Sequence, residues 1–223
     1  MAILPRDVRE YLDAHLPDPG EEFRAIEREG AELSKRATRF APCDRAVGAL
    51  LDFLIRVSGA RIALELGTSV GHSTAWIARA LPAGGKVTTV DHDASMIARA
   101  RANLERLGLV GKIVFVQAEH LDYLKDGRGP VDLIFYDGGK ERMVEAPSHL
   151  ARLLKPGGLL VGSGVLWGGE VARPAPPRPR PGRPREMIAE TAGFNRAVCN
   201  HPELLGMILP IGDGVTIARR HDA

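Results

Sequence analysis

The sequence predicts an α/β fold, a Rossmann-like doubly wound sheet preceded by N-terminal helices. Three observations lead to this prediction. The first sixty residues show helical periodicity, and from Arg61 onward short runs of Val, Ile and Leu alternate with helical stretches. The chain then ends in two strand-like runs joined by a short turn. With 223 residues and 44% apolar content, the chain is long enough for one large domain with a buried core.

The N-terminal part predicts three helices. The first is short and stops at the breaker Pro17-Asp18-Pro19-Gly20, the second is highly charged, and the third carries apolar residues at helical spacing. The three helices are expected over residues 5–15, 21–38 and 44–57. We expect residues 1–58 to pack on or cap a core of residues 59–223, as a region for dimerisation or substrate binding.

The alternating part predicts parallel strands, because its apolar runs are continuous, as in strands that are covered on both faces. The strands are expected over residues 62–66, 87–90, 113–116, 131–136 and 159–165. Between them, helices are expected over residues 72–80, 94–107, 120–125 and 144–154.

A proline- and arginine-rich segment interrupts the pattern after Trp167. Residues 173–185 hold six prolines and five arginines, so an extended loop is expected there. This loop can recognise an anionic acceptor or RNA, or it is a solvated insertion. A helix over residues 186–199 follows, and two strands over 204–209 and 215–219 flank the turn Gly212-Asp213-Gly214. Strands joined so closely are antiparallel.

Composition narrows the function classes. The net charge of +2 gives no global field for nucleic-acid binding, which is possible but not favoured. The two cysteines, Cys43 and Cys199, are far apart and fit a reducing compartment. No signal peptide pattern and no bilayer-length apolar run are found. The sequence therefore predicts a cytoplasmic protein without a membrane partner.

A glycine loop follows the first predicted strand. In GTSVGHS, Gly67 and Gly71 stand at a strand-to-helix turn, where glycine permits positive φ and close approach of a ligand. The spacing G-x-x-x-G differs from the G-x-G-x-x-G of dinucleotide folds, which argues against an oxidoreductase that grips a pyrophosphate. The same spacing also fits an ordinary tight turn.

Acidic residues stand at three neighbouring strand ends. Glu65 precedes the glycine loop and can anchor an ammonium group, and Asp91 ends the second strand, where an acid can bind a ribose diol. Ala118 and Glu119 end the third strand, where adenine lies in such folds. Each can be a solvated strand-end charge, but together they indicate a nucleoside with a cationic amino-acid tail. S-adenosylmethionine fits this description.

The sequence resembles the class I, family 3 O-methyltransferases, which include catechol and caffeoyl-coenzyme A O-methyltransferases. The similarity covers nearly everything from Asp44 onward except the proline- and arginine-rich segment. It is carried by ALELGTSVGHST, TVDHD, VDLIFYDGGKE, LLKPGGLLVGSGVLWGGEVA and LPIGDGVTIARR. The resemblance implies a seven-stranded sheet with an antiparallel last strand, and a homodimer.

The resemblance also implies a set of cofactor-binding residues. Asp91 matches the acid that holds the ribose, and Asp137 matches an aspartate that touches both cofactor and metal. The full set comprises Glu65 before the loop, the loop residues Gly67, Thr68, Ser69, Gly71 and Ser73, the strand-end residues Asp91 and His92, the adenine-side Ala118 and Glu119, and Asp137. His72 and His92 flank these motifs, where a histidine can equally be structural.

The metal site of the family does not carry over. Relatives commonly read D-A-D-K and A-D-N-V-L-W, where this chain has Asp137-Gly138-Gly139-Lys140 and GSGVLW. Two protein ligands therefore fall on Ser163 and Gly164. Mg²⁺ and Ca²⁺ need several oxygen donors, so we expect no family-style metal. His120, Asp122 and His149 show no ligand spacing that compensates.

Lys140 matches the family's catalytic lysine. We expect it, with Asp137, to be catalytic, as a base or an electrostatic anchor, in a transfer of methyl to a small-molecule hydroxyl. Trp167 is expected at the rim of the site or as a core anchor. A cofactor-binding protein without catalysis is the alternative, and the methyl acceptor cannot be read from the sequence.

Overall fold

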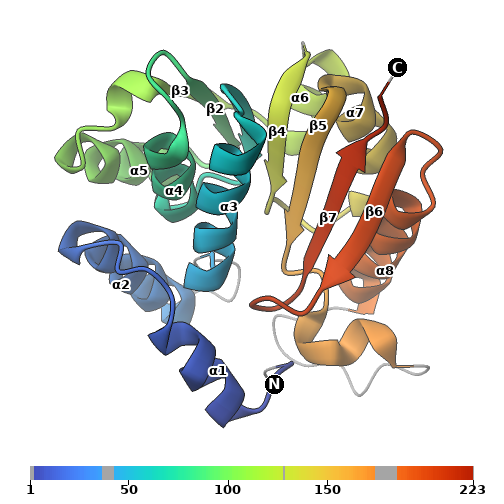
Figure 1. The fold of residues 1–223 in the computed structure, drawn as a ribbon, viewed down its shortest axis with the longest axis horizontal. Helices are drawn as coiled ribbons and strands as arrows, with labels where there is room; N and C mark the ends of the chain where they lie inside the picture. Colours follow the sequence, from blue (N-terminus) through green and yellow to red (C-terminus); the bar gives the residue numbers. More distant parts are fainter. Residues whose placement is uncertain (1–2, 37–42, 128, 174–184, 223) are drawn as a thin grey trace.

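A seven-stranded sheet runs through the molecule in the order β3-β2-β1-β4-β5-β7-β6 (Figure 1). The computed structural model describes residues 3–36, 43–127, 129–173 and 185–222. The strands are β1 Ile62–Leu66, β2 Lys86–Asp91, β3 Ile113–Gln117, β4 Val131–Tyr136, β5 Leu154–Ser163, β6 Leu204–Leu209 and β7 Val215–Arg220. β7 pairs antiparallel with both β5 and β6, and the pairs from β3 to β5 are parallel. The predicted sheet and its antiparallel last strand are confirmed.

Eight α-helices are described, and the ends of several follow from local capping. They are α1 Arg6–Ala14, α2 Glu21–Arg36, α3 Arg45–Ser58, α4 His72–Ala80, α5 Ala94–Arg106, α6 His120–Asp126, α7 Ala146–Leu153 and α8 Arg185–Cys199. Short 3₁₀ turns are η1 Val110–Lys112, η2 Met143–Glu145 and η3 Trp167–Ala172. The Asp44 carboxylate accepts a hydrogen bond from Ala46 N and begins α3, and Gly59 ends it with φ 68°.

The fifth strand differs from its prediction at both ends. It begins at Leu154 rather than at 159, because the chain pairs with β4 across a register shift opposite Val131 and Leu133. It ends at Ser163 rather than at 165, because Gly164 takes a φ of 65° and turns the chain out of the sheet. This turn carries Ser163 and Gly164, where the resemblance to the family led us to expect that two metal ligands are missing.

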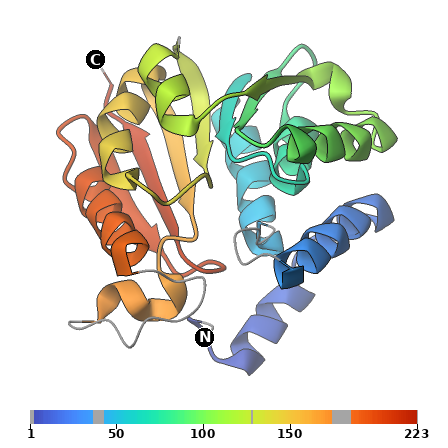
Figure 2. The ribbon, with the colours of Figure 1, turned by 180° about the vertical axis from the view of Figure 1, so that it is seen from behind.

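Helices cover both faces of the sheet, and alternation along each strand decides which residue meets which layer. Leu64 and Leu66 belong to the core with α6, α7 and α8, whereas Ala63 belongs to the core with α3 and α4. In Figure 2, α6, α7 and α8 lie together on one side of β4, β5 and β7. This two-sided burial explains why the strands read as continuous apolar runs.

The N-terminal helices attach to the outer side of α4. α3 packs along α4, and α2 buries Phe23 and Ile26. The Arg79 guanidinium lies over the rings of Phe23 and Trp76, 4.8 Å and 4.3 Å from their centroids. α1 has no buried residue. Among the described residues, no helix is long and apolar enough to cross a membrane.

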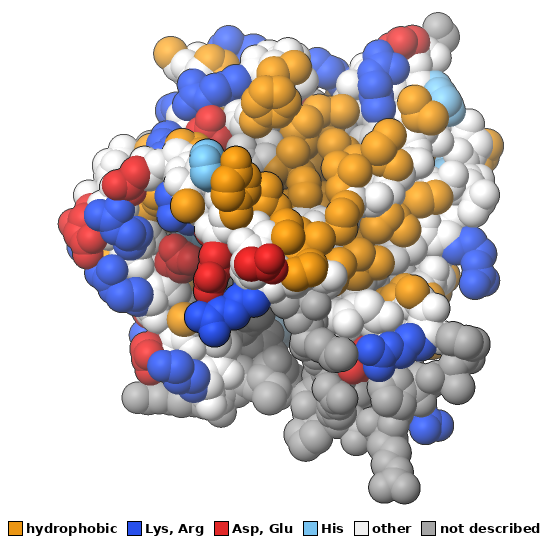
Figure 3. Space-filling view, turned by 60° about the horizontal axis from the view of Figure 1, so that its bottom comes forward, with side chains coloured by type: hydrophobic (Ala, Val, Ile, Leu, Met, Phe, Trp, Pro, Cys, Tyr) orange, Lys and Arg blue, Asp and Glu red, His pale blue; other side chains and the backbone are white. Residues whose placement is uncertain are grey.

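One face of the sheet carries exposed apolar side chains. Figure 3 shows a broad group of apolar side chains when the lower end of the molecule is turned forward. Phe53 and Val57 of α3 and Leu205 and Met207 of β6 are large and exposed.

Apart from Arg173 and Arg185, the predicted proline- and arginine-rich loop lies outside the described residues.

Candidate active site

A large cleft opens at the carboxyl ends of the strands, where ligands bind in folds of this kind. Its volume is about 1180 Å³. Eight of the residues predicted from the sequence line it: Gly67, Thr68, Ser69, Ser73, Asp91, His92, Asp137 and Lys140. The strand order brings the ends of β1, β2 and β4 to one edge, so residues from three separate motifs meet there.

Four predicted site residues do not line this cleft. Gly71 lies behind the loop as the N-cap of α4, with φ 85°. Ala118 N donates to Asp91 O at 3.0 Å, and exposed Glu119 precedes α6. Glu65 is completely buried.

The Asp91 carboxylate organises the glycine loop. Its Oδ2 accepts hydrogen bonds from Thr68 N at 3.0 Å and Ser69 N at 2.9 Å, and its Oδ1 accepts one from Asp93 N at 3.0 Å. Backbone N–H groups converging on one carboxylate satisfy donors that a loop otherwise leaves unpaired. The loop therefore has a fixed shape without a ligand.

Gly67 joins the end of β1 to the end of β4. It has φ 108°, and a Cβ at this position would lie 2.7 Å from Asp137 O. Its N–H donates to Val90 O at 2.9 Å, and Asp137 N donates to Leu66 O at 2.9 Å. Only glycine allows this conformation and this close approach. The contact positions Asp137 against the loop.

Glu65 lies beneath the loop with an uneven set of hydrogen bonds. Thr74 Oγ1 and Thr89 Oγ1 both donate to its Oε2, at 2.5 Å and 2.6 Å, and its Oε1 makes no hydrogen bond. Burial raises the pKa of this carboxyl to about 7, against the opposing effect of the hydroxyls of Ser73, Thr74 and Thr89. This position gives it no direct access to the cleft.

Two buried histidines, which the sequence analysis did not select, line the cleft. His120 Nδ1 accepts a hydrogen bond from Gly139 N at 3.2 Å, and a Cβ on Gly138 would overlap the same ring. Burial lowers the pKa of His120, and it lowers the pKa of His72 to about 4. Both rings are therefore neutral near pH 7. The His120 ring leaves no room for a side chain at position 138, which explains the glycine after Asp137.

Lys140 occupies the corner between the ends of β4 and β5. Its Nζ donates to Ser163 O at 2.7 Å and lies 3.5 Å from Asp137 Oδ1. The side chain of Lys140 is 14% exposed and that of Asp137 is 23% exposed. Burial raises the pKa of Asp137, and the charge of Lys140 acts in the opposite direction. The corner thus holds a partly buried ion pair.

The residues of this corner do not fit a divalent cation. Such an ion needs several oxygen donors. The described residues contain no group of three His, Cys, Asp or Glu side chains that could hold a metal. The Asp137 carboxylate and the Ser163 carbonyl both face the Lys140 ammonium, and Gly164 has no side chain to contribute.

The cleft is also lined by residues far apart in the sequence. Asp13, Arg24 and Glu27 of the N-terminal helices line it, together with Trp167 and Asp213. The Trp167 indole donates to Thr191 Oγ1 at 2.9 Å. These positions follow no motif, so sequence reasoning missed all of them except Trp167, which it expected either at the rim of the site or as a core anchor and which lines the cleft.

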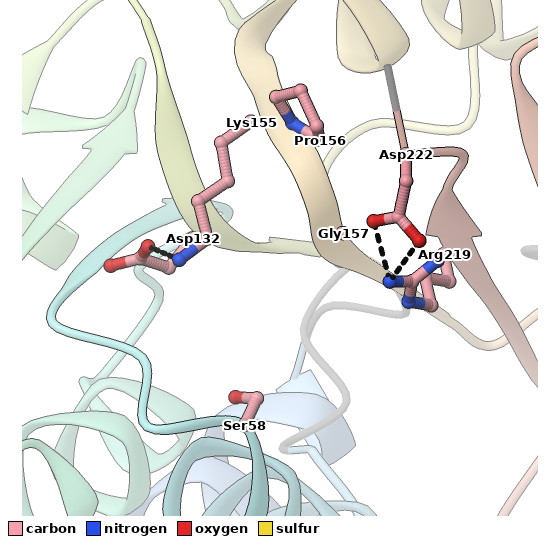
Figure 4. A pocket seen from close by; sticks show the side chains of 7 residues that line it. All are labelled: Ser58, Asp132, Lys155, Pro156, Gly157, Arg219 and Asp222. Carbon is pink, nitrogen blue, oxygen red and sulfur yellow. Dashed lines mark hydrogen bonds and ion pairs between the residues drawn. The ribbon is translucent and has the colours of Figure 1, made fainter.

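A second, smaller pocket lies at the opposite ends of the strands (Figure 4). Its volume is about 230 Å³. Lys155 Nζ lies 2.5 Å from Asp132 Oδ1, and Arg219 Nη2 lies 2.8 Å from Asp222 Oδ1. Asp132 Oδ2 also accepts hydrogen bonds from Arg61 N and Ile62 N at 2.7 Å each. Its charges pair with each other, which favours a structural role.

Comparison with known proteins agrees with the geometry of the large cleft. A family model described as O-methyltransferase matches residues 26–221. A caffeoyl-CoA O-methyltransferase 2 from Petunia hybrida is 31% identical over 212 residues, covering 92% of this chain and 84% of that protein. A catechol O-methyltransferase from Niastella koreensis is 37% identical over 128 residues, covering 56% of this chain and 58% of that protein.

A solved structure shares both the fold and a measurable sequence similarity. It is the O-methyltransferase TomG of Streptomyces achromogenes, involved in tomaymycin synthesis and solved in complex with S-adenosylmethionine. The two chains are 25% identical with a TM-score of 0.79, and the match covers 96% of each.

Proposed function

This chain belongs to the O-methyltransferase family whose model spans residues 26–221, and from that premise we propose that it methylates a small-molecule hydroxyl without a divalent cation. It is an S-adenosylmethionine-dependent methyltransferase. The proposal depends on a difference between two parts of the cleft. In the glycine loop, Thr68 N and Ser69 N both donate to Asp91, so the loop proposed to bind the cofactor is held in place. At the ends of β4 and β5, Lys140 takes the oxygen of Ser163 that a cation would need.

The residues of the loop fit S-adenosylmethionine. When bound, this cofactor supplies an electrophilic methyl group on a sulfonium. A carboxylate can accept about four hydrogen bonds, and Asp91 uses three of these for backbone N–H groups, so it can accept a further one from a ribose hydroxyl. His92 lies beside Asp91, with its Nδ1 3.6 Å from Asp91 Oδ1, at the same edge of the cleft.

The methionine end is assigned to the glycine loop. Gly67, Thr68, Ser69 and Ser73 would face it, since all four line the cleft. Gly71 contributes by its conformation at the start of α4. We assign Glu65 an indirect role, because its carboxylate contacts Thr74 and Thr89 rather than the cleft.

The adenine end is assigned to Ala118 and Glu119, which continue from β3. Neither lines the cleft, so their contribution would come through the backbone that joins β3 to α6. His120, the first residue of α6, is the group on this side that does line it.

Asp137 and Lys140 are assigned to the acceptor. They would position the hydroxyl oxygen near the methyl group, which is the main contribution a protein makes to a displacement of this type. We assign the other end of the acceptor to the N-terminal helices, because Asp13, Arg24 and Glu27 line the cleft there.

The test is production of S-adenosylhomocysteine from S-adenosylmethionine with a panel of phenolic acceptors, with and without EDTA. Turnover that is unchanged by EDTA is expected. Loss of turnover in EDTA with recovery on adding Mg²⁺ would refute the metal-independent part. Absence of S-adenosylmethionine binding by calorimetry would refute the function itself.

We also propose that two copies of the chain associate through the exposed apolar face. Exposed Phe53, Val57, Leu205 and Met207 support this, since large apolar patches on soluble proteins mark interaction sites. Light scattering after gel filtration should give the mass of a dimer for the wild type. The double variant Leu205→Lys, Met207→Lys should give a monomer, and Val114→Lys on the exposed side of β3 should leave the dimer intact. A monomeric wild type would contradict the proposal.

A further inference from the structure

The most informative feature outside the cofactor loop is the position of the Lys140 ammonium. It lies between the Asp137 carboxylate, 3.5 Å away, and the Ser163 carbonyl, 2.7 Å away. These are the two places, at the ends of β4 and β5, where related sequences supply metal ligands. The positive charge of the side chain therefore stands where oxygen ligands would converge on a cation.

Buried polar side chains hold the turn that follows Ser163, the residue whose carbonyl accepts from this ammonium. Asn195 Nδ2 donates to Val165 O at 2.9 Å, and Thr216 Oγ1 donates to Asn195 Oδ1 at 2.7 Å. Both polar side chains are buried, so they hold the turn after β5 rigidly beside Ser163. A Cβ on Gly164 would lie 3.6 Å from Lys140 Nζ, so the glycine leaves open space in front of the ammonium.

The ammonium has one donor to spare. A lysine ammonium has three N–H donors. One is used by Ser163 O and one faces Asp137 Oδ1. Lys140 makes no other hydrogen bond among the described residues, and it lines the cleft. The third N–H is therefore available to a ligand oxygen in the cleft.

We propose that Lys140 is a fixed internal cation that replaces the divalent metal, and that the acceptor is a molecule with a single acidic hydroxyl, such as a phenol. This rests on the proposed function. The acidic hydroxyl of the acceptor would lose its proton to water, and the ammonium would donate its free N–H to the resulting anionic oxygen and stabilise its charge. That oxygen would form the new O–C bond to the methyl group as the C–S bond breaks, and the sulfur would keep the electron pair. A divalent cation has several open positions and can chelate two neighbouring hydroxyls. One free N–H binds one oxygen, so a vicinal diol has no advantage here.

A spectroscopic experiment tests the charge directly. 4-Nitrophenol changes its absorption when it ionises, and it would be titrated against the protein saturated with S-adenosylhomocysteine. An opposite charge within contact distance shifts an ionisation by about 1–3 pH units. We expect the ionisation midpoint of bound nitrophenol to fall by at least about one unit in the wild type. Lys140→Arg should keep most of this shift, and Lys140→Met should abolish it. Lys125→Met, at an exposed position outside the cleft, should match the wild type.

Kinetics with the same variants distinguish two roles of Lys140, that of a fixed cation and that of a base that accepts a proton. Arginine stays charged and cannot act as a base. Lys140→Met removes the donor that keeps the bound acceptor oxygen ionised, so kcat/KM for a monophenol should fall by about 10²–10³, the cost of losing one donor to an oxyanion. Lys140→Arg should retain activity within about tenfold of the wild type. Monophenols should be methylated as well as catechols by the wild type.

Three results would overturn the inference. The first is that Lys140→Arg is as inactive as Lys140→Met and leaves the ionisation midpoint of bound nitrophenol unshifted. The second is that the wild type methylates only vicinal diols. The third is that Lys140→Met keeps the full shift of the nitrophenol midpoint. Failure of the proposed function looks different. The wild type would then form no S-adenosylhomocysteine with any phenol, while the nitrophenol measurement would still decide the role of Lys140.

Discussion

Two regions at the same edge of the sheet are built by different principles. The region that we assign to the cofactor, after β1 and β2 (the cofactor region), depends on the main chain, since Asp91 holds the N–H groups of Thr68 and Ser69. The region that we assign to the acceptor, after β4 and β5 (the acceptor region), depends on side chains, since Lys140 faces Asp137 and the carbonyl of Ser163. The sequence analysis expected the first to match the family and the second to depart from it.

The difference shows which kind of site can change within a fixed fold. The cofactor region could not change without moving the backbone, because a Cβ at Gly67 would already collide with the backbone of Asp137. Changing the acceptor region requires only new side chains at the end of one strand. Ser163 still pairs with Val215 of β7, so the sheet is undisturbed by the altered corner.

The largest expected effect comes from Glu65, the buried carboxyl beneath the glycine loop of the cofactor region. The pKa of Glu65 is raised from 4.5 to about 7, so the folded protein binds a proton more tightly than the unfolded chain. The resulting stabilisation is fully present below pH 4.5 and is lost as the pH rises through about 7. Its size is about 3 kcal/mol, at 1.36 kcal/mol per unit of pKa.

Glu65→Gln should remove this dependence. Urea unfolding from pH 5 to pH 8 should show the wild type losing stability relative to the variant as the pH rises. A difference between the two proteins that stays constant with pH would show that Glu65 is already ionised in the folded state.

The next effect concerns the carboxylate that organises the loop. Asp91→Ala removes the acceptor for Thr68 N and Ser69 N and the proposed ribose contact. We expect affinity for S-adenosylmethionine to fall about 100-fold, or about 2.7 kcal/mol. Calorimetry measures this, with Asp126→Ala at an exposed position as the control. An affinity within threefold of the wild type would remove Asp91 from the site.

A smaller effect is expected at the contact between the two regions. In Gly67→Ala, the new Cβ would lie 2.7 Å from Asp137 O, at a φ of 108°. We expect a loss of about 2 kcal/mol in unfolding free energy, within the range for strained backbone. Gly139→Ala is the matched control, because its Cβ meets the flexible end of Glu141 at 3.0 Å. Equal stability of the two variants would contradict the assigned contact.

The smallest effect is expected when oxygen ligands for a metal are added at positions 163 and 164. Ser163→Asp with Gly164→Asn places two oxygen donors beside Asp137, and asparagine tolerates the φ of 65° at position 164. Mn²⁺ binding, measured by electron paramagnetic resonance, should be weak while Lys140 is present. Adding Lys140→Met should strengthen it about tenfold, or about 1.4 kcal/mol, because the ammonium no longer competes. An unchanged affinity would show that Lys140 does not occupy the place of the cation.

Much of the fold and half of the site could be predicted from sequence because their signals are local. Continuous apolar runs marked the strands of the parallel part, and the short turn at Gly212-Asp213-Gly214 marked the antiparallel end. Gly67 and Asp91 were recognisable because each stands at a strand end. The departure at Ser163 and Gly164 was also visible, since it needs only a comparison of residue types.

Other features depend on contacts between distant segments. His120 fills the space that a side chain at Gly138 would need, and Asp13 reaches the cleft from the N-terminal end of the chain. No pattern links such residues, since a contact across many residues leaves no periodicity in either segment.

The sequence by itself determined the order of strands and helices and the position of the glycine loop between β1 and α4, because periodicity and turn residues act over a few positions. The tertiary structure decided that Glu65 lies under the loop, because alternation along β1 directs it away from the cleft. It also decided that the Lys140 ammonium meets the carbonyl of Ser163. That meeting exists only because β4 and β5 are neighbours in the sheet and end at the same edge.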